Sequence, residues 1–409
     1  MAEEMGSEET TDEAERLRAE LVEDLVADET IKTEAVRNAF RAVPRHLFVP
    51  EASLADAYAR FAVTTRTDER GQATSSVSDP HIQAVMLELA GIEPGMSVLE
   101  IGSGGYNAAL IQELVGATGS VLSVDIDAVV VDRARKFLDE AGYEMVTVVQ
   151  ADAENPIPGA PFDRILVTAG AWDIPPSWRE QLAEGGRLVV PLRTFGVTRV
   201  VALDSIDGLL RGQTSAPAGF VPVLGAGAHT ERTWMLKGEQ VAIVMDDGEL
   251  DDPNRLDGLL AKERSEAWSS ATIGRSEPFD FLYLYLACEL DGFVRMHADG
   301  SDGDPGLGLE PGEKFFPFAH VYKGDSLAFM VVRPTEEASR VELGARALGP
   351  HAAQAAEAMA EAMRGWDLLR DGRGPLYQVH PAQTPDHELE TGLVLDKRHS
   401  RIVISWPAE

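Results

Sequence analysis

Cysteine, basic residues and long apolar runs are scarce in this 409-residue sequence, and each scarcity excludes a class of protein. The single cysteine, Cys288, cannot form an intramolecular disulfide bond, and we expect it to be a small buried side chain. The apolar runs fall short of the roughly 20 residues that a membrane-spanning helix needs. With 36 lysines and arginines against 68 aspartates and glutamates, the net charge is −32. Such a charge repels nucleic-acid phosphates and anionic membrane surfaces, so neither is an expected partner.

The first residues, MAEEMGSEETTDEAE, are acidic and polar. They contain neither the basic stretch nor the apolar stretch of a secretion signal, so with the single cysteine they favour a cytoplasmic protein. We expect residues 1–11 to be disordered. From residue 12 to residue 43 apolar side chains recur at helical spacing, which predicts two helices, the second ended by Pro44.

Strand and helix patterns alternate regularly from Pro80 to Leu192. The predicted strands are 96–102, 120–126, 145–152, 162–170 and 187–192, and the predicted helices are 81–91, 106–116, 128–142 and 175–186. The strands are rich in valine, isoleucine and leucine without alternation, which is typical of a parallel sheet covered on both faces. We therefore predict a doubly wound, mostly parallel α/β domain over residues 12–226.

The alternation ends after Leu224, and we assign residues 230–409 to a C-terminal α+β domain that recognises the substrate. Its aromatic segments, FDFLYLYL and KFFPFAHVY, could form an apolar surface for a peptide. The predicted elements are a helix at 256–267, an aromatic segment at 279–290, strands at FFPFAHVY, SLAFMVVR and RIVISW, and a helix at 351–370. The acidic stretch HADGSDGDPGLGLEPGE lacks the spacing of a calcium loop, so we interpret it as a solvated loop and predict no metal site.

The stretch VLEIGSGGYNAAL, residues 98–110, carries the clearest functional signal. Gly102 and Gly104 follow a predicted strand, where the first turn of a βαβ unit lets a ligand approach the backbone. A dinucleotide fingerprint requires glycine or alanine three positions after Gly104, and that position is Asn107. No Gly-Lys-Ser/Thr follows either, so the loop is not expected to bind a pyrophosphate.

Acidic residues end three successive predicted strands: Glu100, Asp125 and Asp152. Three carboxylates suit a ligand with an ammonium and a sulfonium better than a ligand with phosphates, because opposite charges attract. Asp125 stands where the acid of such units accepts hydrogen bonds from ribose hydroxyls. The pattern predicts S-adenosyl-L-methionine as the cofactor.

With their flanks, these residues resemble the protein-L-isoaspartate O-methyltransferase family. The resemblance covers about Val36 to Leu224 and depends on four ordered motifs: VPRHLFVPEASLADAY, SSVSDPH, APFDRILVTAGAWDIPPSWREQLAEGGRLVVPL and FVPVLG. It implies the S-adenosylmethionine-dependent methyltransferase fold and methyl transfer to a carboxylate of a protein or peptide.

The resemblance also implies the residues of the site. Ser78 matches the family's active-site serine, so we expect it to be catalytic by donating a hydrogen bond to a substrate carboxylate. Considered alone, Ser78 could instead be the N-cap of the following helix. His81, nearby, is interpreted as a surface or core histidine. The predicted cofactor-binding residues are Ser75, Ser76, Val77, Ser78, Gln83, Glu100, Gly102, Gly104, Gly105, Asp125, Ile126, Asp152 and Ala153.

Two departures from the family pattern bear on the substrate. The family's loop reads acid-x-Gly-x-Gly-x-Gly-Tyr, whereas EIGSGGY is one residue shorter, and the chain continues well beyond the family core. In both respects it is similar to relatives that methylate a normal aspartate in ribosomally made, cyclised peptides such as lanthipeptides, which then form succinimide and isoaspartate. We therefore predict a peptide-tailoring aspartate methyltransferase. The alternatives are general isoaspartate repair and a non-catalytic, cofactor-binding interaction protein. The sequence predicts no oligomeric state.

Overall fold

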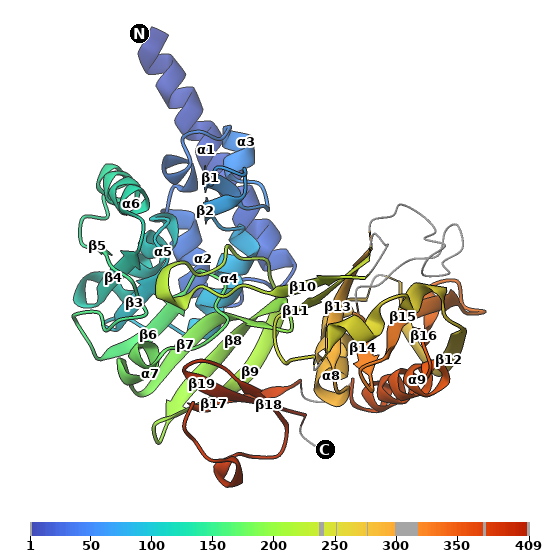
Figure 1. The fold of residues 1–409 in the computed structure, drawn as a ribbon. Helices are drawn as coiled ribbons and strands as arrows, with labels where there is room; N and C mark the ends of the chain where they lie inside the picture. Colours follow the sequence, from blue (N-terminus) through green and yellow to red (C-terminus); the bar gives the residue numbers. More distant parts are fainter. Residues whose placement is uncertain are drawn as a thin grey trace.

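The computed structural model describes residues 2–236, 241–250, 252–275, 277–298, 318–370 and 374–406. It contains a larger unit, which begins with the N-terminal helix, and a smaller unit beside it (Figure 1). From residue 299 onward, the acidic stretch that we interpret as a solvated loop lies outside the described residues. None of the described helices combines the length and the hydrophobicity needed to cross a bilayer.

Two helices form the N-terminal part of the larger unit. Helix α1 (Ala2–Ala27) buries Leu21 and Leu25, and helix α2 (Glu34–Ala42) buries Phe40. The two helices were predicted, but the expected disorder of residues 1–11 does not match α1, which begins at Ala2. Glutamate and alanine, which are common in this segment, are good helix formers, so an acidic composition does not prevent a helix.

A ten-stranded sheet forms the centre of the larger unit, in the order β18-β19-β17-β9-β8-β7-β6-β3-β4-β5. The five strands from β7 to β5 pair in parallel, and the others pair antiparallel. The parallel strands are β3 (Ser97–Ile101), β4 (Ser120–Asp125), β5 (Thr147–Gln150), β6 (Phe162–Val167) and β7 (Leu182–Thr194). They confirm the predicted α/β fold class.

Both faces of the parallel strands are covered, as a doubly wound sheet requires. Val98 and Leu99 are neighbours in β3 and point to two different hydrophobic clusters, the first shared with α2, α4 and α5 and the second with α7. The helices are α4 (Pro80–Ala90), α5 (Tyr106–Val115), α6 (Ala128–Glu140) and α7 (Pro176–Glu180). Helix α7 was predicted to reach residue 186, but β7 already begins at Leu182.

Three short elements precede α4 and two antiparallel strands follow β7. The first are α3 (Leu54–Ala57) and the hairpin of β1 (Val63–Thr67) with β2 (Ala73–Val77). The second are β8 (Val197–Ile206) and β9 (Leu209–Pro217), which extend the sheet away from β5. The sequence pattern did not predict this antiparallel extension.

The smaller unit is a seven-stranded antiparallel sheet with two helices, α8 (Asp280–Glu289) and α9 (Ala352–Leu369). Its strands are β10 (Arg232–Met235), β11 (Val241–Met245), β12 (Arg264–Gly274), β13 (Phe293–Ala298), β14 (Phe318–Tyr322), β15 (Ser326–Pro334) and β16 (Arg340–Leu348). The predicted helix at 256–267 is wrong: a left-handed Gly258, with φ of 72°, separates two short 3-10 turns, and β12 begins at Arg264.

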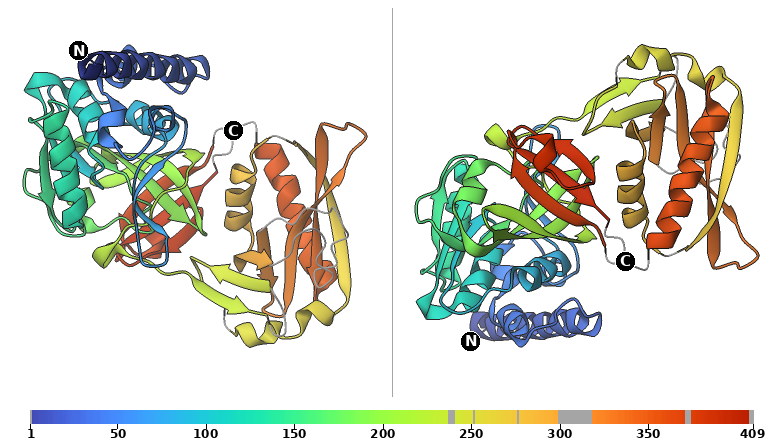
Figure 2. Two further views of the ribbon diagram at one scale, coloured as in Figure 1. Left: turned by 90° about the horizontal axis from the view of Figure 1, so that it is seen from above. Right: turned by 90° about the horizontal axis from the view of Figure 1, so that it is seen from below.

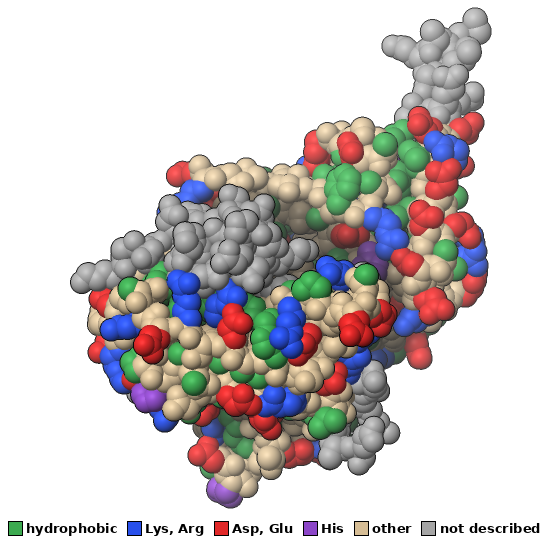
Figure 3. All heavy atoms as spheres, turned by 90° about the vertical axis from the view of Figure 1, so that its right-hand side faces the viewer, with side chains coloured by type: hydrophobic (Ala, Val, Ile, Leu, Met, Phe, Trp, Pro, Cys, Tyr) green, Lys and Arg blue, Asp and Glu red, His purple; other side chains and the backbone are tan. Residues whose placement is uncertain are grey.

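Most of the aromatic segment FDFLYLYL is buried in the core, whereas Phe281 is 38% exposed. Helix α8 buries Leu282, Tyr283, Leu284 and Leu286. On the face of the smaller unit seen in Figure 3, basic and acidic side chains are interspersed. Most side chains of this helix are therefore unavailable for the predicted apolar surface.

The chain returns to the larger sheet at its end. Strand β17 (Leu376–Pro381) pairs with β9, and β19 (Ser400–Ser405) pairs with β17 and β18 (Leu393–Asp396). Figure 2 shows these terminal strands against the larger unit and helix α9 in the smaller one. The predicted C-terminal domain of residues 230–409 thus needs correction: the smaller unit is inserted between β9 and β17. The terminal strands cover the edge of β9, which would otherwise present unpaired backbone groups.

The two units meet through buried acids that follow β11. Phe195 and Gly196, in the turn between β7 and β8, donate backbone hydrogen bonds to Asp247 (2.7 Å) and Asp246 (2.9 Å). Arg193 also pairs with Asp246, at 3.0 Å. These contacts fix the smaller unit against the end of the central sheet.

Candidate functional site

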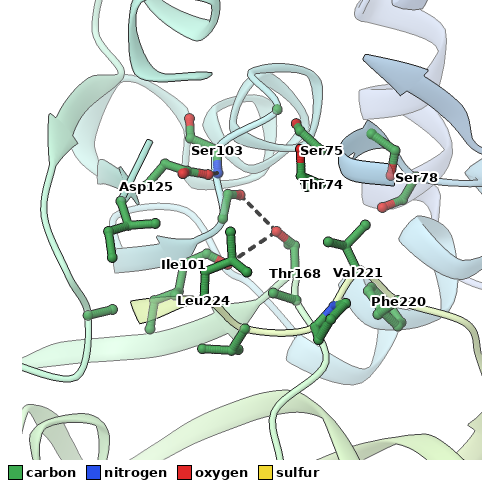
Figure 4. A pocket seen from close by; sticks show the side chains of 18 of the residues that line it. Thr74, Ser75, Ser78, Ile101, Ser103, Asp125, Thr168, Phe220, Val221 and Leu224 are labelled. Atoms are coloured by element: carbon green, nitrogen blue, oxygen red, sulfur yellow. Dashed lines mark hydrogen bonds between the residues drawn. The ribbon is translucent and has the colours of Figure 1, made fainter. Parts of the chain in front are cut away.

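A pocket of about 480 Å³ lies at the carboxyl ends of β3, β4 and β5. Ligands of open α/β sheets bind at these ends, and the volume lies in the usual range of small-molecule sites. Predicted residues that line it are Ser75, Ser76, Ser78, Gly102, Gly104, Asp125, Ile126, Asp152 and Ala153. Figure 4 shows Asp125 and Ser103 on one side and Ser75 and Ser78 on another.

The turn after β3 needs a glycine at position 102. Gly102 has φ of 99°, and a Cβ atom there would lie 2.5 Å from Oγ1 of Thr168. The Thr168 hydroxyl lies 2.7 Å from the carbonyl of Gly102 and 3.1 Å from that of Ile101, so it ties the turn to the end of β6. Thr168 lines the pocket and was not predicted, although it follows a strand as Asp125 does.

Gly105 has a different position from the other loop glycines. It is the N-cap of α5 with φ of 81°, and a Cβ atom there would lie 3.1 Å from the ring of Phe48. It is absent from the described pocket lining, so its part is to let α5 begin close to the N-terminal helices.

Asp125 is held in a fixed orientation at the end of β4. Its Oδ2 accepts a hydrogen bond from the backbone of Ser103 (3.0 Å), and its Oδ1 accepts one from the backbone of Asp127 (2.9 Å). Burial raises the pKa of Asp125 above its ordinary value. A carboxylate has about four acceptor positions, so the two backbone bonds leave room for ribose hydroxyls.

Glu100 lies behind the loop and not in the main pocket. Its carboxylate is fully buried, accepting hydrogen bonds from Nδ2 of Asn107 (2.8 Å) and from the Ser123 hydroxyl. It lines a smaller adjoining cavity together with Asn107. Burial raises the pKa of Glu100 to about 7. Asn107, the residue that breaks the dinucleotide fingerprint, therefore anchors the first turn of α5 to β3.

Val77 and Gln83 line the same smaller cavity and are also outside the main pocket. Both accept hydrogen bonds from the buried guanidinium of Arg45, Gln83 through Oε1 (3.0 Å) and Val77 through its carbonyl (3.3 Å). This network holds the junction between β2 and α4, so the two residues support the serine-rich wall without lining the main pocket.

The acidic wall continues beyond β5. Oδ1 of Asp152 accepts a hydrogen bond from the backbone of Glu154 (3.0 Å), and Oδ2 accepts one from that of Ala226 (3.2 Å). The carbonyl of Ala153 accepts a hydrogen bond from Nε1 of Trp178, at 2.9 Å. Glu154 and Trp178 also line the pocket, and neither was predicted.

Hydroxyl groups line the opposite wall, between β2 and α4. The N-cap of α4 is Asp79, whose side chain accepts a hydrogen bond from the backbone of His81 (2.8 Å). The alternative role of Ser78 as N-cap is therefore wrong. Within the described part of the chain, the Ser78 hydroxyl makes no hydrogen bond and lines the pocket. Nδ1 of His81 lies 3.0 Å from Thr30 of the N-terminal segment.

The segment 219–224 closes the pocket from below, as Figure 4 shows for Phe220, Val221 and Leu224. It is held to Gly170 by two backbone hydrogen bonds, from Gly170 to Val221 (2.8 Å) and from Val223 to Gly170 (3.0 Å). The motif FVPVLG marked this segment as the end of a core, but its place under the pocket could not be read from the sequence.

The charge of the pocket matches the predicted ligand. Its described lining includes Asp79, Asp125, Asp152 and Glu154 and no lysine, arginine or histidine. This donor set repels phosphate and attracts the ammonium and sulfonium groups of S-adenosyl-L-methionine. The residues present therefore fit the predicted cofactor.

Comparisons with known proteins identify the family of the chain. A family model described as Protein-L-isoaspartate(D-aspartate) O-methyltransferase matches residues 15–228. The chain is 42% identical over 194 residues to a protein-L-isoaspartate O-methyltransferase of Methanococcoides burtonii, covering 47% of this chain and 93% of the relative. It is 38% identical over 213 residues to the enzyme of that name from Methanothermobacter thermautotrophicus, covering 51% and 95%.

A solved structure of a protein-L-isoaspartate O-methyltransferase has a similar fold, with a TM-score of 0.50 and 20% sequence identity. The likeness covers 94% of this chain and 98% of that one, so it includes the smaller unit. The part of the chain beyond the family core therefore has a counterpart in the fold of that structure. The chain belongs to the protein-L-isoaspartate(D-aspartate) O-methyltransferase family, whose members are carboxyl O-methyltransferases that use S-adenosyl-L-methionine.

Proposed function

We propose that this protein methylates the side-chain carboxylate of isoaspartyl residues in proteins or peptides, with its cofactor bound in the pocket described above. One observation carries the proposal: a single pocket has the carboxylates of Asp125 and Asp152 on one wall and the hydroxyl of Ser78 on another. The first wall suits a cationic adenosyl ligand, and the second suits a carboxylate that accepts hydrogen bonds.

In this proposal the residues of the chain bind and orient, and they do not abstract a proton. S-adenosyl-L-methionine, when bound, supplies a methyl group on a positively charged sulfur. Asp125 accepts hydrogen bonds from the ribose hydroxyls, and Ser78 donates one to the substrate carboxylate. A carboxyl group near its reference pKa of about 4 is ionised at neutral pH, so no strong base is required. Orientation and exclusion of water account for the catalysis.

The names of the relatives support isoaspartate as the substrate, because the chain covers 93% and 95% of two protein-L-isoaspartate O-methyltransferases. One observation still supports the prediction of peptide tailoring: the short loop EIGSGGY, in which α5 begins directly after Gly105. A ribosomally made, lanthipeptide-like precursor is therefore kept as the second candidate substrate.

Three peptides separate these functions when they are offered to the full chain with S-adenosyl-L-methionine. They are a linear isoaspartyl hexapeptide, its aspartyl twin and a head-to-tail cyclic aspartyl peptide, with methyl incorporation followed by mass spectrometry. The proposal expects the isoaspartyl peptide alone to be methylated. Methylation of only the cyclic peptide, followed by loss of methanol, would favour tailoring. Cofactor binding without turnover of any peptide would favour the non-catalytic interaction protein.

A further inference from the structure

Three consecutive residues, Lys397, Arg398 and His399, form a tight turn between β18 and β19, which we call the KRH turn. The backbone of Lys397 donates a hydrogen bond to the carbonyl of Ser400 (2.9 Å), which closes the turn. The KRH turn lies far beyond the residues 15–228 that the family model matches. It nevertheless lies against the pocket, because the terminal strands return to the central sheet.

Two side chains of the KRH turn contact residues that build the pocket wall. Nε2 of His399 lies 2.6 Å from Oε1 of Glu154, which lines the pocket. Nη1 of Arg398 donates a hydrogen bond to the carbonyl of Ala226, at 2.5 Å. The backbone of Ala226 in turn donates a hydrogen bond to Oδ2 of Asp152, at 3.2 Å. Arg398 is therefore connected through Ala226 to a second carboxylate that lines the pocket.

The wall that these contacts support is a pair of loops packed with little spare room. Gly225 has φ of 75°, and a Cβ atom there would lie 2.5 Å from Cδ1 of Ile126 and 2.7 Å from Oδ2 of Asp152. A Cβ atom at Gly227 would lie 3.0 Å from Oε2 of Glu154. The segment 225–227 therefore determines where both carboxylates stand, and loops keep such positions only through their contacts.

The KRH turn is itself fixed at its base and on its far side. Oδ2 of Asp173 accepts a hydrogen bond from the backbone of His399 (2.7 Å), and Oδ1 accepts one from the Ser400 hydroxyl (2.6 Å). The ammonium of Lys397 pairs with the buried carboxylate of Asp247 in the smaller unit and lies 4.1 Å from the ring centroid of Trp172. A turn anchored at both ends can hold the pocket wall in place.

We propose that Arg398 and His399 are positioning residues of the cofactor pocket, which hold segment 225–227 and Glu154 where the adenosyl group is bound. The inference rests on the cofactor site described under Proposed function. It assigns a part of that site to a segment outside the family core. Loss of either contact releases the wall from the KRH turn, and the result is a weaker cofactor site in a chain that remains folded.

The test uses the full chain with the variants Arg398→Ala and His399→Gln, and His387→Gln as the matched control. His387 lies in the same C-terminal segment, and its side chain is 81% exposed. We expect each of the two variants to weaken calorimetric binding of S-adenosylhomocysteine by about 5- to 10-fold, the effect of losing one polar contact. The control should bind like the wild type.

Kinetics distinguish positioning from a loss of stability. We expect KM for S-adenosyl-L-methionine to rise while kcat at saturating cofactor stays within 2-fold of the wild type. In a double-mutant cycle, Glu154→Gln combined with His399→Gln should bind no more weakly than the poorer single variant, because both remove one contact. Additive losses, or a thermal midpoint that falls with unchanged affinity, would overturn the inference.

The Asp125→Ala variant separates this inference from the proposed function. If Asp125→Ala weakens cofactor binding and both KRH-turn variants bind like the wild type, the inference alone fails. If Asp125→Ala also binds like the wild type, the cofactor site itself is wrongly assigned, and the inference that rests on it fails as well.

Discussion

Glu100 should make the larger unit less stable as the pH rises, and Glu100→Gln should remove this dependence. The carboxylate is fully buried between β3 and α5, where its hydrogen bonds come from the neutral donors Asn107 and Ser123. Within the described part of the chain, no cation affects the pKa of Glu100, and the charge of Asp125 raises it further. Burial therefore disfavours the ionised form and raises the pKa of Glu100 from 4.5 to about 7.

The sign and the size follow from the two pKa values. Between pH 4.5 and pH 7 the unfolded chain releases a proton from Glu100 that the folded chain retains. The contribution of Glu100 to the unfolding free energy therefore falls as the pH rises through this window and is constant above it. A shift of this size corresponds to about 3 kcal/mol of unfolding free energy at about 1.4 kcal/mol for each pKa unit. A buried glutamine does not ionise and retains one acceptor. The unfolding free energy of the variant, relative to that of the wild type, should therefore increase by roughly 2–3 kcal/mol from pH 5 to pH 8.

The measurement is urea denaturation followed by circular dichroism at pH 5, 6, 7 and 8 for the wild type, Glu100→Gln and the control Glu140→Gln. Glu140 lies at the end of α6 and is exposed, so its variant should follow the wild type at every pH. A difference between Glu100→Gln and the wild type that stays the same from pH 5 to pH 8 would refute the raised pKa and the reasoning from burial.

Three further predictions concern the pocket itself. Asp125→Ala should weaken calorimetric binding of S-adenosylhomocysteine by about 2 kcal/mol or more. In the wild type, binding should weaken as the pH falls through the pKa of Asp125. This should occur at a higher pH than for an ordinary carboxyl group, because burial raises the pKa of Asp125. Equal affinity in the variant would contradict the placement. Ser78→Ala should lower the single-turnover rate by about 10-fold with cofactor affinity unchanged, and a wild-type rate would remove the serine from catalysis. Gly102→Ala should abolish cofactor binding, because the new Cβ atom would lie 2.5 Å from Oγ1 of Thr168. The matched control is Gly71→Ala, since Gly71 has a similar φ of 79° and a Cβ atom there would meet nothing within 4 Å. Equal binding by the two variants would refute the steric argument.

The parallel half of the larger unit could be predicted because its signals are local. Each strand is a short apolar run, and helices α4 and α5 end at glycines, of which Gly91 has φ of 54°. An acid at the end of a strand, as at Asp125, then implies a place at one edge of the sheet. The same rule identifies Thr168 at the end of β6, but a threonine carries no charge to draw attention to it.

The rest depends on pairings that sequence patterns do not contain. Glu100 also ends a strand, yet its side chain is directed behind the loop because Asn107 and Ser123 supply its hydrogen bonds there. Strand β17 pairs Leu376 with Gln213 of β9, two residues separated by the whole smaller unit. The sequence of neither strand indicates the strand with which it pairs, so the sequence analysis assigned the C-terminal strands to the wrong unit.

This return of the chain changes how the larger unit must be delimited in any experiment on the substrate. The domain predicted over residues 12–226 would end near Gly225, so a cut there would be expected to release the methyltransferase core. In the structure the same cut removes β17, β18 and β19, exposes the edge of β9 and deletes the KRH turn that contacts Glu154 and Ala226. A truncated chain that lost cofactor binding would therefore report damage to the pocket and would say nothing about the smaller unit. The part played by the smaller unit has to be tested in the full chain, by substitutions on its surface that leave Lys397 and Asp247 in contact.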